Sequence, residues 1–232
     1  LVLADGMGGH LHGDLAATLA VENFVESFGA HAQSRFADPQ LFLEDTMRHA
    51  HERIMRIPHD SDKGFPGTTC VAALIQDGKI YWGYAGDSRI YVLRNDAVLV
   101  KSRDHSMVHQ WVEWGMITAE EARIHPQRNQ ITNCLGGVNN MFYVEPGESI
   151  MLQSGDVLLL GSDGLWGPFI DQELAETFAL KPVADALDGL VMRALEREAG
   201  HSDNVTGVAV RWGSEEMAHD TAEPVCHVLA IP

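Results

Sequence analysis

The feature that most constrains this chain is a repeated pattern in which an apolar, strand-like run ends in an aspartate and a small residue. The pattern occurs at residues 1–6, 83–88 and 158–164, and a fourth aspartate opens the last strand-like run at 202–205. A single such aspartate is often only a turn former. Several carboxylates at the ends of buried strands would repel one another unless cations lay between them, and Mg²⁺ and Mn²⁺ prefer oxygen ligands. The recurrence predicts a multi-metal carboxylate site.

The spacing of apolar residues predicts two amphipathic helices early in the chain. The first follows the glycine-rich turn 5–13. Its apolar residues at helical spacing are Leu15, Ala16, Leu19, Ala20, Phe24, Val25 and Phe28. The second begins at Asp38-Pro39, an N-cap residue followed by proline at the first helical position. Five residues are expected on one face of the second helix, namely Leu41, Phe42, Met47, Ala50 and Ile54.

Short β-branched runs follow, separated by the turn dipeptides Asp77-Gly78 and Asn95-Asp96, which are typical of antiparallel hairpins. The expected strands are 68–75, 79–85, 89–94, 97–100, 142–144, 148–152, 157–160 and 205–212. Residues 105–129 interrupt them with a helix near 108–114 and a capping-box spacing that begins at Thr118. A later helix spans about 183–195. Antiparallel strands with helices in separate pairs predict a layered α+β domain.

Composition excludes several classes of protein. The 232 residues include 16 Lys and Arg against 33 Asp and Glu, a net charge of −17, which disfavours nucleic-acid binding because that requires a basic face. Hydrophobic residues make up 45%, which fits a packed core rather than a disordered chain. No run approaches the ~20 apolar residues of a membrane span. The three cysteines lack CxxC spacing, so we expect a reducing, cytoplasmic compartment without disulfides or thiolate zinc.

Taken in order, the motifs resemble those of a known family, the metal-dependent protein serine/threonine phosphatases of type 2C (PPM), in their bacterial form. The resemblance covers residues 1–212 and rests on seven motifs, at residues 5–10, 67–69, 86–89, 104–106, 125–129, 162–165 and 203–206. It implies a central β-sandwich of two antiparallel sheets flanked by pairs of helices. This architecture agrees with the α+β class that the pattern of elements predicts.

The resemblance also implies a set of metal ligands. Asp5 would bridge two Mn²⁺ or Mg²⁺ ions, the backbone carbonyl of Gly6 would bind one of them, and Asp163 and Asp203 would complete the set; these three aspartates are the candidate catalytic residues. Asp87 matches a position associated with a third metal, although it could simply cap its hairpin. We expect Arg89 to fix that turn rather than contact substrate, and Asn204 to lie behind the ligands.

Two ions roughly 3.5–4 Å apart would activate a bridging water for in-line attack on phosphorus without a covalent intermediate. The expected substrates are phosphoserine and phosphothreonine in proteins, placed there by a serine/threonine kinase. No nucleic-acid or membrane partner is expected, and the sequence leaves the oligomeric state open. A GxGxxG reading of the first glycines fails because Leu11 occupies a required position.

The sequence departs from the family pattern in two ways. Met7 stands where eukaryotic members carry a histidine proposed as general acid, and the family's upstream phosphate-binding arginine is absent. We therefore expect one catalytic domain over 1–212 that lacks its N-terminal strand region, with a flap at about 105–135 and an acidic tail at 213–232. The alternative is a catalytically weak phosphatase-fold module that binds a partner protein through the flap.

The positions and roles of four histidines are predicted separately. His10 and His12 lie in the glycine-rich turn, where a surface position is expected and a catalytic role is a minor alternative. His105 and His109 have the i, i+4 spacing of a helical zinc pair, but we expect a solvated, substrate-facing surface for them. The tryptophans are interpreted as packing residues, and Cys70 and Cys134 as buried or unreactive thiols.

Overall fold

The computed structural model describes residues 1–7, 12–31, 35–58, 64–137, 142–179, 181–198 and 204–213. They divide into a first unit, residues 1–88 and 103–149, and a second unit, residues 89–102 and the chain from Ile150 onward. Each unit combines an antiparallel sheet with helices, which confirms the α+β class. Stacking of the sheets in a sandwich and a single domain over 1–212 stay predictions. His10, Asp203 and the tail beyond Gly213 lie outside the described residues.

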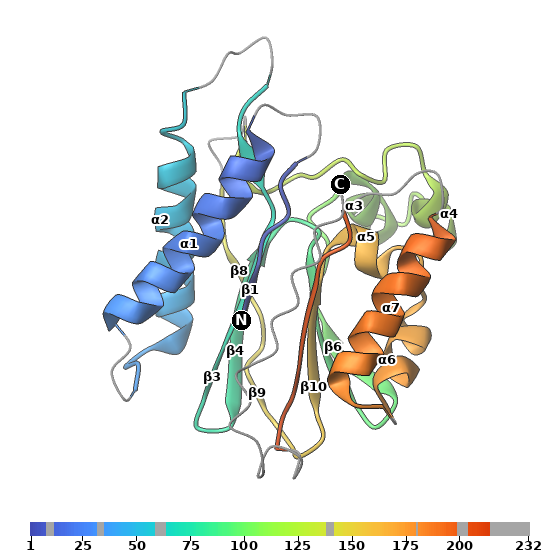
Figure 1. The fold of residues 1–232 in the computed structure, drawn as a ribbon. Coiled ribbons are helices and arrows are strands. Elements are labelled where there is room, and N and C mark those ends of the chain that lie inside the picture. Colours follow the sequence, from blue (N-terminus) through green and yellow to red (C-terminus); the bar gives the residue numbers. More distant parts are fainter. Residues whose placement is uncertain are drawn as a thin grey trace. The chain divides into compact units, whose positions relative to one another are not determined.

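The first unit contains a sheet with strand order β1-β3-β4-β8, in which every pairing on that path is antiparallel. Its strands are β1 (Val2–Leu3), β3 (Cys70–Gln76), β4 (Lys79–Ala85) and β8 (Glu145–Pro146). A short ladder pairs β2 (Gly67–Thr68) with β7 (Leu135–Gly136). Helices α1 (Gly13–His31) and α2 (Pro39–Ile54) lie side by side along this sheet, as Figure 1 shows.

The packing of α1 and α2 corrects the predicted faces. On α1 the small residues Ala16 and Ala20 are buried, whereas Val25 is 65% exposed and Phe28 is 50% exposed. On α2 the prediction holds for Met47, Ala50 and Ile54 but is wrong for Leu41, which is half exposed. Alanines let a helix approach its neighbour closely; Phe24, at 6% exposure, is buried with them, whereas Val25 and Phe28 remain outside. The Asp38 carboxylate accepts from two N–H groups at the start of α2, which confirms the N-cap.

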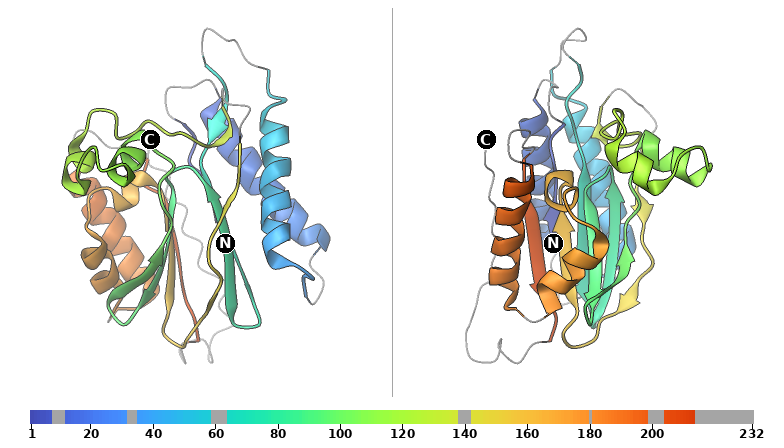
Figure 2. Two further views of the ribbon diagram at one scale, coloured as in Figure 1. Left: turned by 180° about the vertical axis from the view of Figure 1, so that it is seen from behind. Right: turned by 90° about the vertical axis from the view of Figure 1, so that its right-hand side faces the viewer.

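Before β7 the chain forms two further helices of the first unit, α3 (Met107–Glu113) and α4 (Ala119–Ile124), which lie together in both views of Figure 2. Thr118 and Glu121 make the reciprocal hydrogen bonds of the predicted capping box. Trp114, at the end of α3, is 66% exposed. The expectation that every tryptophan is a packing residue is therefore wrong at this position, although it holds for the buried Trp82.

The second unit contains an antiparallel sheet with strand order β11-β10-β5-β6. Its elements are β5 (Arg89–Arg94), β6 (Ala97–Lys101), β9 (Ile150–Met151), β10 (Val157–Gly161), α5 (Asp163–Trp166), α6 (Asp171–Ala179), α7 (Val183–Arg197) and β11 (Gly207–Arg211). Leu174 and Phe178 of α6 and Leu190 of α7 pack with the buried strand residues. All five residues of β10 are buried, so this strand lies inside the core.

Several predicted strand bounds are wrong. Residues 142–144 are not a strand but precede β8, and the expected strand 148–152 is reduced to β9. Helix α6 was not predicted. Both hairpin turns are confirmed, because Asp77, Gly78, Asn95 and Asp96 all have positive φ, the left-handed conformation that such two-residue turns require.

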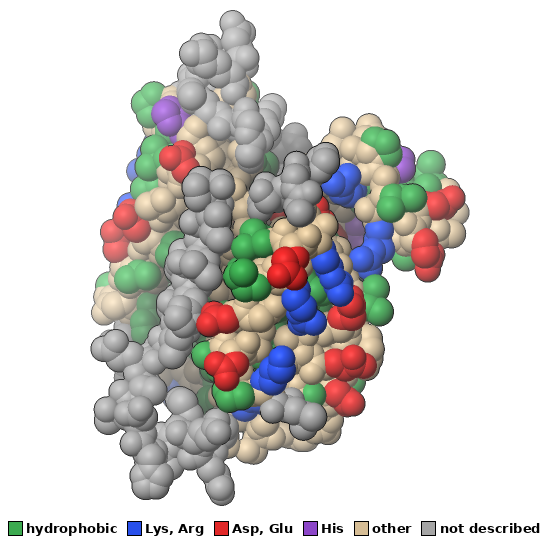
Figure 3. Space-filling model, turned by 45° about the vertical axis from the view of Figure 1, so that its right-hand side comes forward, with side chains coloured by type: hydrophobic (Ala, Val, Ile, Leu, Met, Phe, Trp, Pro, Cys, Tyr) green, Lys and Arg blue, Asp and Glu red, His purple; other side chains and the backbone are tan. Residues whose placement is uncertain are grey.

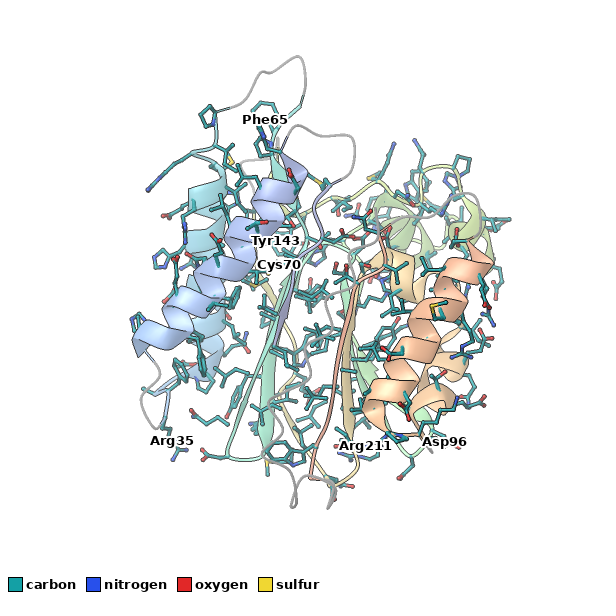
Figure 4. All side chains as sticks on the ribbon, in the orientation of Figure 1. Arg35, Phe65, Cys70, Asp96, Tyr143 and Arg211 are labelled. Carbon is teal, nitrogen blue, oxygen red and sulfur yellow. The ribbon has the colours of Figure 1, made fainter. Side chains whose placement is uncertain are left out.

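Hydrogen bonds and ion pairs at the surface connect the helices of the second unit to neighbouring segments. Arg211, labelled in Figure 4, donates from Nη2 to the carbonyls of Phe178 at 2.6 Å and Lys181 at 3.0 Å, which satisfies carbonyls at the end of α6. Basic and acidic side chains are intermixed on the face drawn in Figure 3. In the second unit, Glu173 and Arg197 form an ion pair at 2.7 Å. Among the described residues, no helix is long and apolar enough to cross a membrane.

Candidate metal centre

Asp5 lies just after β1, where its backbone is bonded on both sides to one threonine. The Thr69 N–H donates to the Asp5 carbonyl at 2.9 Å, and the Asp5 N–H donates to Thr69 Oγ1 at 3.1 Å. Thr68 Oγ1 donates to the same carbonyl at 2.9 Å. The side chain of Asp5 thus projects from a backbone segment held by three hydrogen bonds.

Gly6 must be glycine because the chain passes very close to the start of α1. A Cβ at this position would lie 2.3 Å from the carbonyl oxygen of Gly13, a contact that no side chain can make. Gly6 also forms an isolated antiparallel bridge with Thr68, and the Met7 N–H donates to the Gly67 carbonyl at 3.1 Å. The predicted backbone ligand therefore lies in a segment whose path is fixed by packing.

Asp87 lies in the turn between β4 and β5 and is only 7% exposed. Gly86 before it has φ +112°, and a Cβ there would meet Thr69 Cβ at 2.7 Å. Ser88 Oγ is hydrogen-bonded to Thr69 Oγ1 at 2.7 Å. Thr69 therefore joins the Asp5 backbone to the Asp87 turn through one hydroxyl, 64 and 19 residues apart in sequence.

The negative charge of Asp87 contributes to the raised pKa of a neighbouring thiol. Burial, and secondarily Asp87, raises the pKa of Cys134 to about 11, and burial raises the pKa of the fully buried Cys70 to about 12. Both thiols are therefore protonated at neutral pH. Cys70 is buried, as expected, and Cys134 is partly buried; the raised pKa values of both disfavour the reactive thiolate form.

His105 is buried rather than solvated, so the surface expectation for it is wrong. It exchanges two hydrogen bonds with Gly86: the Gly86 N–H donates to Nδ1 at 3.1 Å, and the His105 N–H donates to the Gly86 carbonyl at 3.0 Å. Nε2 faces Glu145 Oε2 at 3.1 Å, and the ring stacks on Tyr84. Burial lowers the pKa of His105, although Glu145 opposes this shift. A neutral imidazole thus fixes the turn that carries Asp87.

The zinc alternative does not match the geometry of this segment. His105 precedes α3, whose N-cap is Ser106, so His105 and His109 are not one turn apart on a helix. Within the described part of the chain, no group of three or more His, Cys, Asp and Glu side chains could hold a metal ion. His12 is exposed, as expected for the glycine-rich turn.

Asp163 is the first residue of α5, directly after β10. Its Oδ1 accepts from the Gly164 N–H at 2.8 Å, and its carbonyl accepts from Gly167 N–H at 2.7 Å. Arg89, which pairs with Gly161 across the sheet, places its guanidinium 3.3 Å from the centre of the Trp166 ring and donates to Tyr91 Oη at 2.9 Å. Arg89 therefore holds local structure, in line with the expectation.

The predicted donors that lie among the described residues are all oxygens: the carboxylates of Asp5, Asp87 and Asp163 and the carbonyl of Gly6. Oxygen donors, one of them on a buried carboxylate, match the chemistry of a hard divalent cation and not that of a thiolate site. Asp203 lies outside the described residues, but the residue after it, Asn204, accepts a hydrogen bond from Ser162. Oxygen donors of this kind suit Mn²⁺ or Mg²⁺, but the described residues alone do not form a group of three or more side chains that could hold an ion, so the ligand set stays a prediction.

Sequence reasoning missed the hydrogen bonds that Thr69, Ser162 and His105 make with the segments next to these aspartates. Each of these residues lies inside a motif that the sequence displays, at 67–69, 162–165 and 104–106. The motifs contain these three residues, but their hydrogen-bond partners lie 19 to 64 residues away in the sequence. Only the folded chain reveals these contacts.

Comparison with known proteins places the chain among phosphatases. Residues 1–205 match a family model described as protein phosphatase 2C. The protein phosphatase PhpP of Streptococcus pneumoniae is 31% identical over 218 residues, which cover 93% of this chain and 87% of the relative. The solved structure of the serine/threonine phosphatase Stp1 from Staphylococcus aureus has a TM-score of 0.82 at 30% identity, covering 92% and 84% of the two chains. A catalytic domain of PstP solved with two manganese ions has a TM-score of 0.75 at 28% identity, covering 90% and 85%.

Proposed function

Because this chain belongs to the protein phosphatase 2C family, we propose that it hydrolyses phosphoserine and phosphothreonine in proteins with the help of Mn²⁺ or Mg²⁺. Both the relatives and the donor chemistry support the proposal. PhpP is named as a protein phosphatase and Stp1 as a serine/threonine phosphatase. The proposed substrates are proteins phosphorylated by a serine/threonine kinase.

The proposed ligands are those that the motifs indicate. Asp5, the Gly6 carbonyl, Asp163 and Asp203 would hold two ions, and Asp87 would serve a third. When bound, such ions lower the pKa of a coordinated water and neutralise charge on phosphoryl oxygens. The PstP structure with two manganese ions supports this number of ions for the family.

The single observation that carries the proposal is the hydrogen-bonded network around Thr69. It joins the Asp5 backbone to Ser88, the residue directly after Asp87, through hydrogen bonds of 2.7 to 3.1 Å. Turn-forming aspartates alone would not require such a connection. Preorganised ligands are expected where a cation must be bound in one geometry.

The residues of the chain have distinct proposed tasks. Asp5 and Asp163 would hold the ions, whereas Thr69 and the Gly164 N–H would orient the aspartates. His105 remains neutral at pH 7, because burial lowers its pKa, and it would fix the Asp87 turn without exchanging protons.

The direct test is hydrolysis of a phosphothreonine peptide by the purified chain. We expect Mn²⁺-dependent turnover that EDTA abolishes and added Mn²⁺ restores. Asp5→Asn and Asp163→Asn should each lower kcat/KM by more than ~100-fold, because even residues behind metal ligands typically account for ~10 to 100-fold. Asp96→Asn is the matched control, since it changes a hairpin residue at φ +63° that asparagine tolerates.

Two outcomes would contradict the proposal. Full activity of the metal-stripped chain would exclude the metal mechanism. A folded chain without turnover in Mn²⁺ or Mg²⁺ would instead favour the alternative, a phosphatase-fold module that binds a partner protein.

A further inference from the structure

Ser162 occupies the N-cap position of α5 but does not cap that helix. A serine at this position normally accepts from an N–H of the first helical turn. Here its side chain makes no such bond, and the Asp163 carboxylate takes the Gly164 N–H instead. Ser162 is fully buried, at 0% exposure, so its hydroxyl must find its partners inside the protein.

Those partners are backbone atoms of the segment that leads into β11. Ser162 Oγ donates to the Asn204 carbonyl at 3.1 Å and accepts from the Thr206 N–H at 3.0 Å. The Ser162 N–H also donates to the Thr206 carbonyl at 3.0 Å. The regular pairing of β10 with β11 ends at Gly161 and Gly207. The serine side chain therefore extends the connection between the two strands beyond the end of their ladder.

The position of this extension is informative, because each connected segment adjoins a candidate ligand. Asp163 follows Ser162 directly, and Asn204 follows Asp203 in the sequence. We propose that Ser162 is a positioning residue of the metal centre: its hydroxyl fixes the spacing between the two segments that carry Asp163 and Asp203. This inference rests on the proposed function, which makes both aspartates metal ligands.

A purely structural role for Ser162 makes a different prediction. If the hydroxyl only satisfied a buried N–H, its loss would lower stability and leave metal affinity unchanged. If it positions the ligands, metal affinity falls by more than the loss of stability explains. Residues that support metal ligands typically change affinity by ~10 to 100-fold.

The experiment measures Mn²⁺ affinity of the full chain by electron paramagnetic resonance of the free ion, with thermal melting of the EDTA-treated protein alongside. The variants are Ser162→Ala, which removes the hydroxyl, and Ser162→Cys, which keeps a side chain of similar shape with a weak donor. The matched control is Ser102→Ala, in the same unit. Ser102 is 2% exposed and its hydroxyl also accepts from a backbone N–H, that of Ile90 at 3.1 Å.

We expect Ser162→Ala and Ser162→Cys to raise the Mn²⁺ dissociation constant by about tenfold or more. Ser102→Ala should melt earlier, like Ser162→Ala, yet bind Mn²⁺ as the unchanged chain does. If Ser162→Ala fails to fold, Ser162→Cys decides the matter, because it leaves almost no cavity.

The inference would be overturned if Ser162→Cys bound Mn²⁺ within twofold of the unchanged chain, or if Ser102→Ala weakened binding equally. Failure of the proposed function is distinguishable, because in that case the unchanged chain itself would bind no Mn²⁺.

Discussion

The hydroxyl groups next to the candidate aspartates make different kinds of contact in the two units. In the first unit, Thr69 Oγ1 bonds to the Asp5 N–H and to another side chain, Ser88 Oγ. In the second unit, the partners of Ser162 Oγ among the described residues are backbone atoms, of Asn204 and Thr206. The first arrangement needs two hydroxyl side chains, whereas the second needs one.

The units also differ in backbone conformation near these hydroxyls. The Asp87 turn depends on a glycine at φ +112° and on the buried His105, which exchanges two hydrogen bonds with Gly86. In contrast, Asp163 begins a short helix whose N-cap, Ser162, is in extended conformation. We conclude that the backbone next to Asp87 depends on an unusual turn. The backbone next to Asp163 is ordinary secondary structure with one additional hydroxyl group, that of Ser162.

The largest expected effect comes from Gly86→Ala. A Cβ at φ +112° and 2.7 Å from Thr69 Cβ combines backbone strain with a steric overlap, and together these should cost about 3 kcal/mol of stability. Gly155→Ala in the second unit is the control, because Gly155 has φ +93° and nothing within 4 Å of its Cβ. It should cost only about 1 kcal/mol. Urea unfolding measures the free energy of unfolding of both variants. Equal losses of stability would contradict the view that the Asp87 turn depends on an unusual, tightly packed glycine.

Acid should affect the two units over different pH ranges. Burial lowers the pKa of His105, so its contribution to stability is present above the unfolded value of about 6.5 and declines as the pH falls below it. Burial alone would raise the pKa of Asp156, but hydrogen bonds from Arg94 and the Gln153 N–H outweigh this and lower it. Its contribution is lost only below about pH 4, as the pH falls through its folded value.

Hydrogen exchange at pH 7, 5.5 and 3.5, corrected for intrinsic rates, checks this order. Protection around Gly86 in the first unit should fall by pH 5.5, and protection of β10 in the second unit only near pH 3.5. His105→Asn, whose Oδ1 can still accept from the Gly86 N–H, should remove the upper range. Simultaneous loss of protection in both units would contradict the assignment.

The smallest expected effects come from surface ion pairs. Arg197 donates twice to Glu173, at 3.0 and 2.7 Å, and lies over the Phe169 ring. Arg35 contacts Asp77 at 2.7 Å, with both side chains more than half exposed. Exposed pairs contribute little, so Arg197→Ala should lower the urea midpoint slightly and Arg35→Ala still less. A larger loss for Arg35→Ala would show that exposure does not rank these pairs.

Local sequence chemistry predicted much of the secondary structure. The N-cap at Asp38, the capping box at Thr118 and the two hairpin turns depend on residues within four positions of one another, so their patterns are complete in the sequence. The order of motifs also indicated the family. In the caps and turns, the residues that cause the structure are the same neighbouring residues that form the sequence pattern.

What the sequence could not reveal depends on distant partners. The burial of His105 results from contacts with Gly86, Asn133 and Glu145, and the role of Thr69 from contacts with Asp5 and Ser88. The face of α1 was predicted correctly at Ala16, Ala20 and Phe24 but wrongly at Val25 and Phe28, which are exposed, because the spacing of apolar residues does not show which of them meet a neighbouring element. The ligand assignments of Asp5, Gly6, Asp87, Asp163 and Asp203 stay predictions.

The exposed indole of Trp114 allows binding to the α3–α4 segment to be followed by tryptophan fluorescence. Trp82 is 4% exposed, so a soluble quencher such as acrylamide should reach Trp114 and leave Trp82 emitting. A protein that covered this segment would shield Trp114 and restore part of the quenched fluorescence. The chain therefore carries its own label for binding at the predicted flap, and no dye has to be attached.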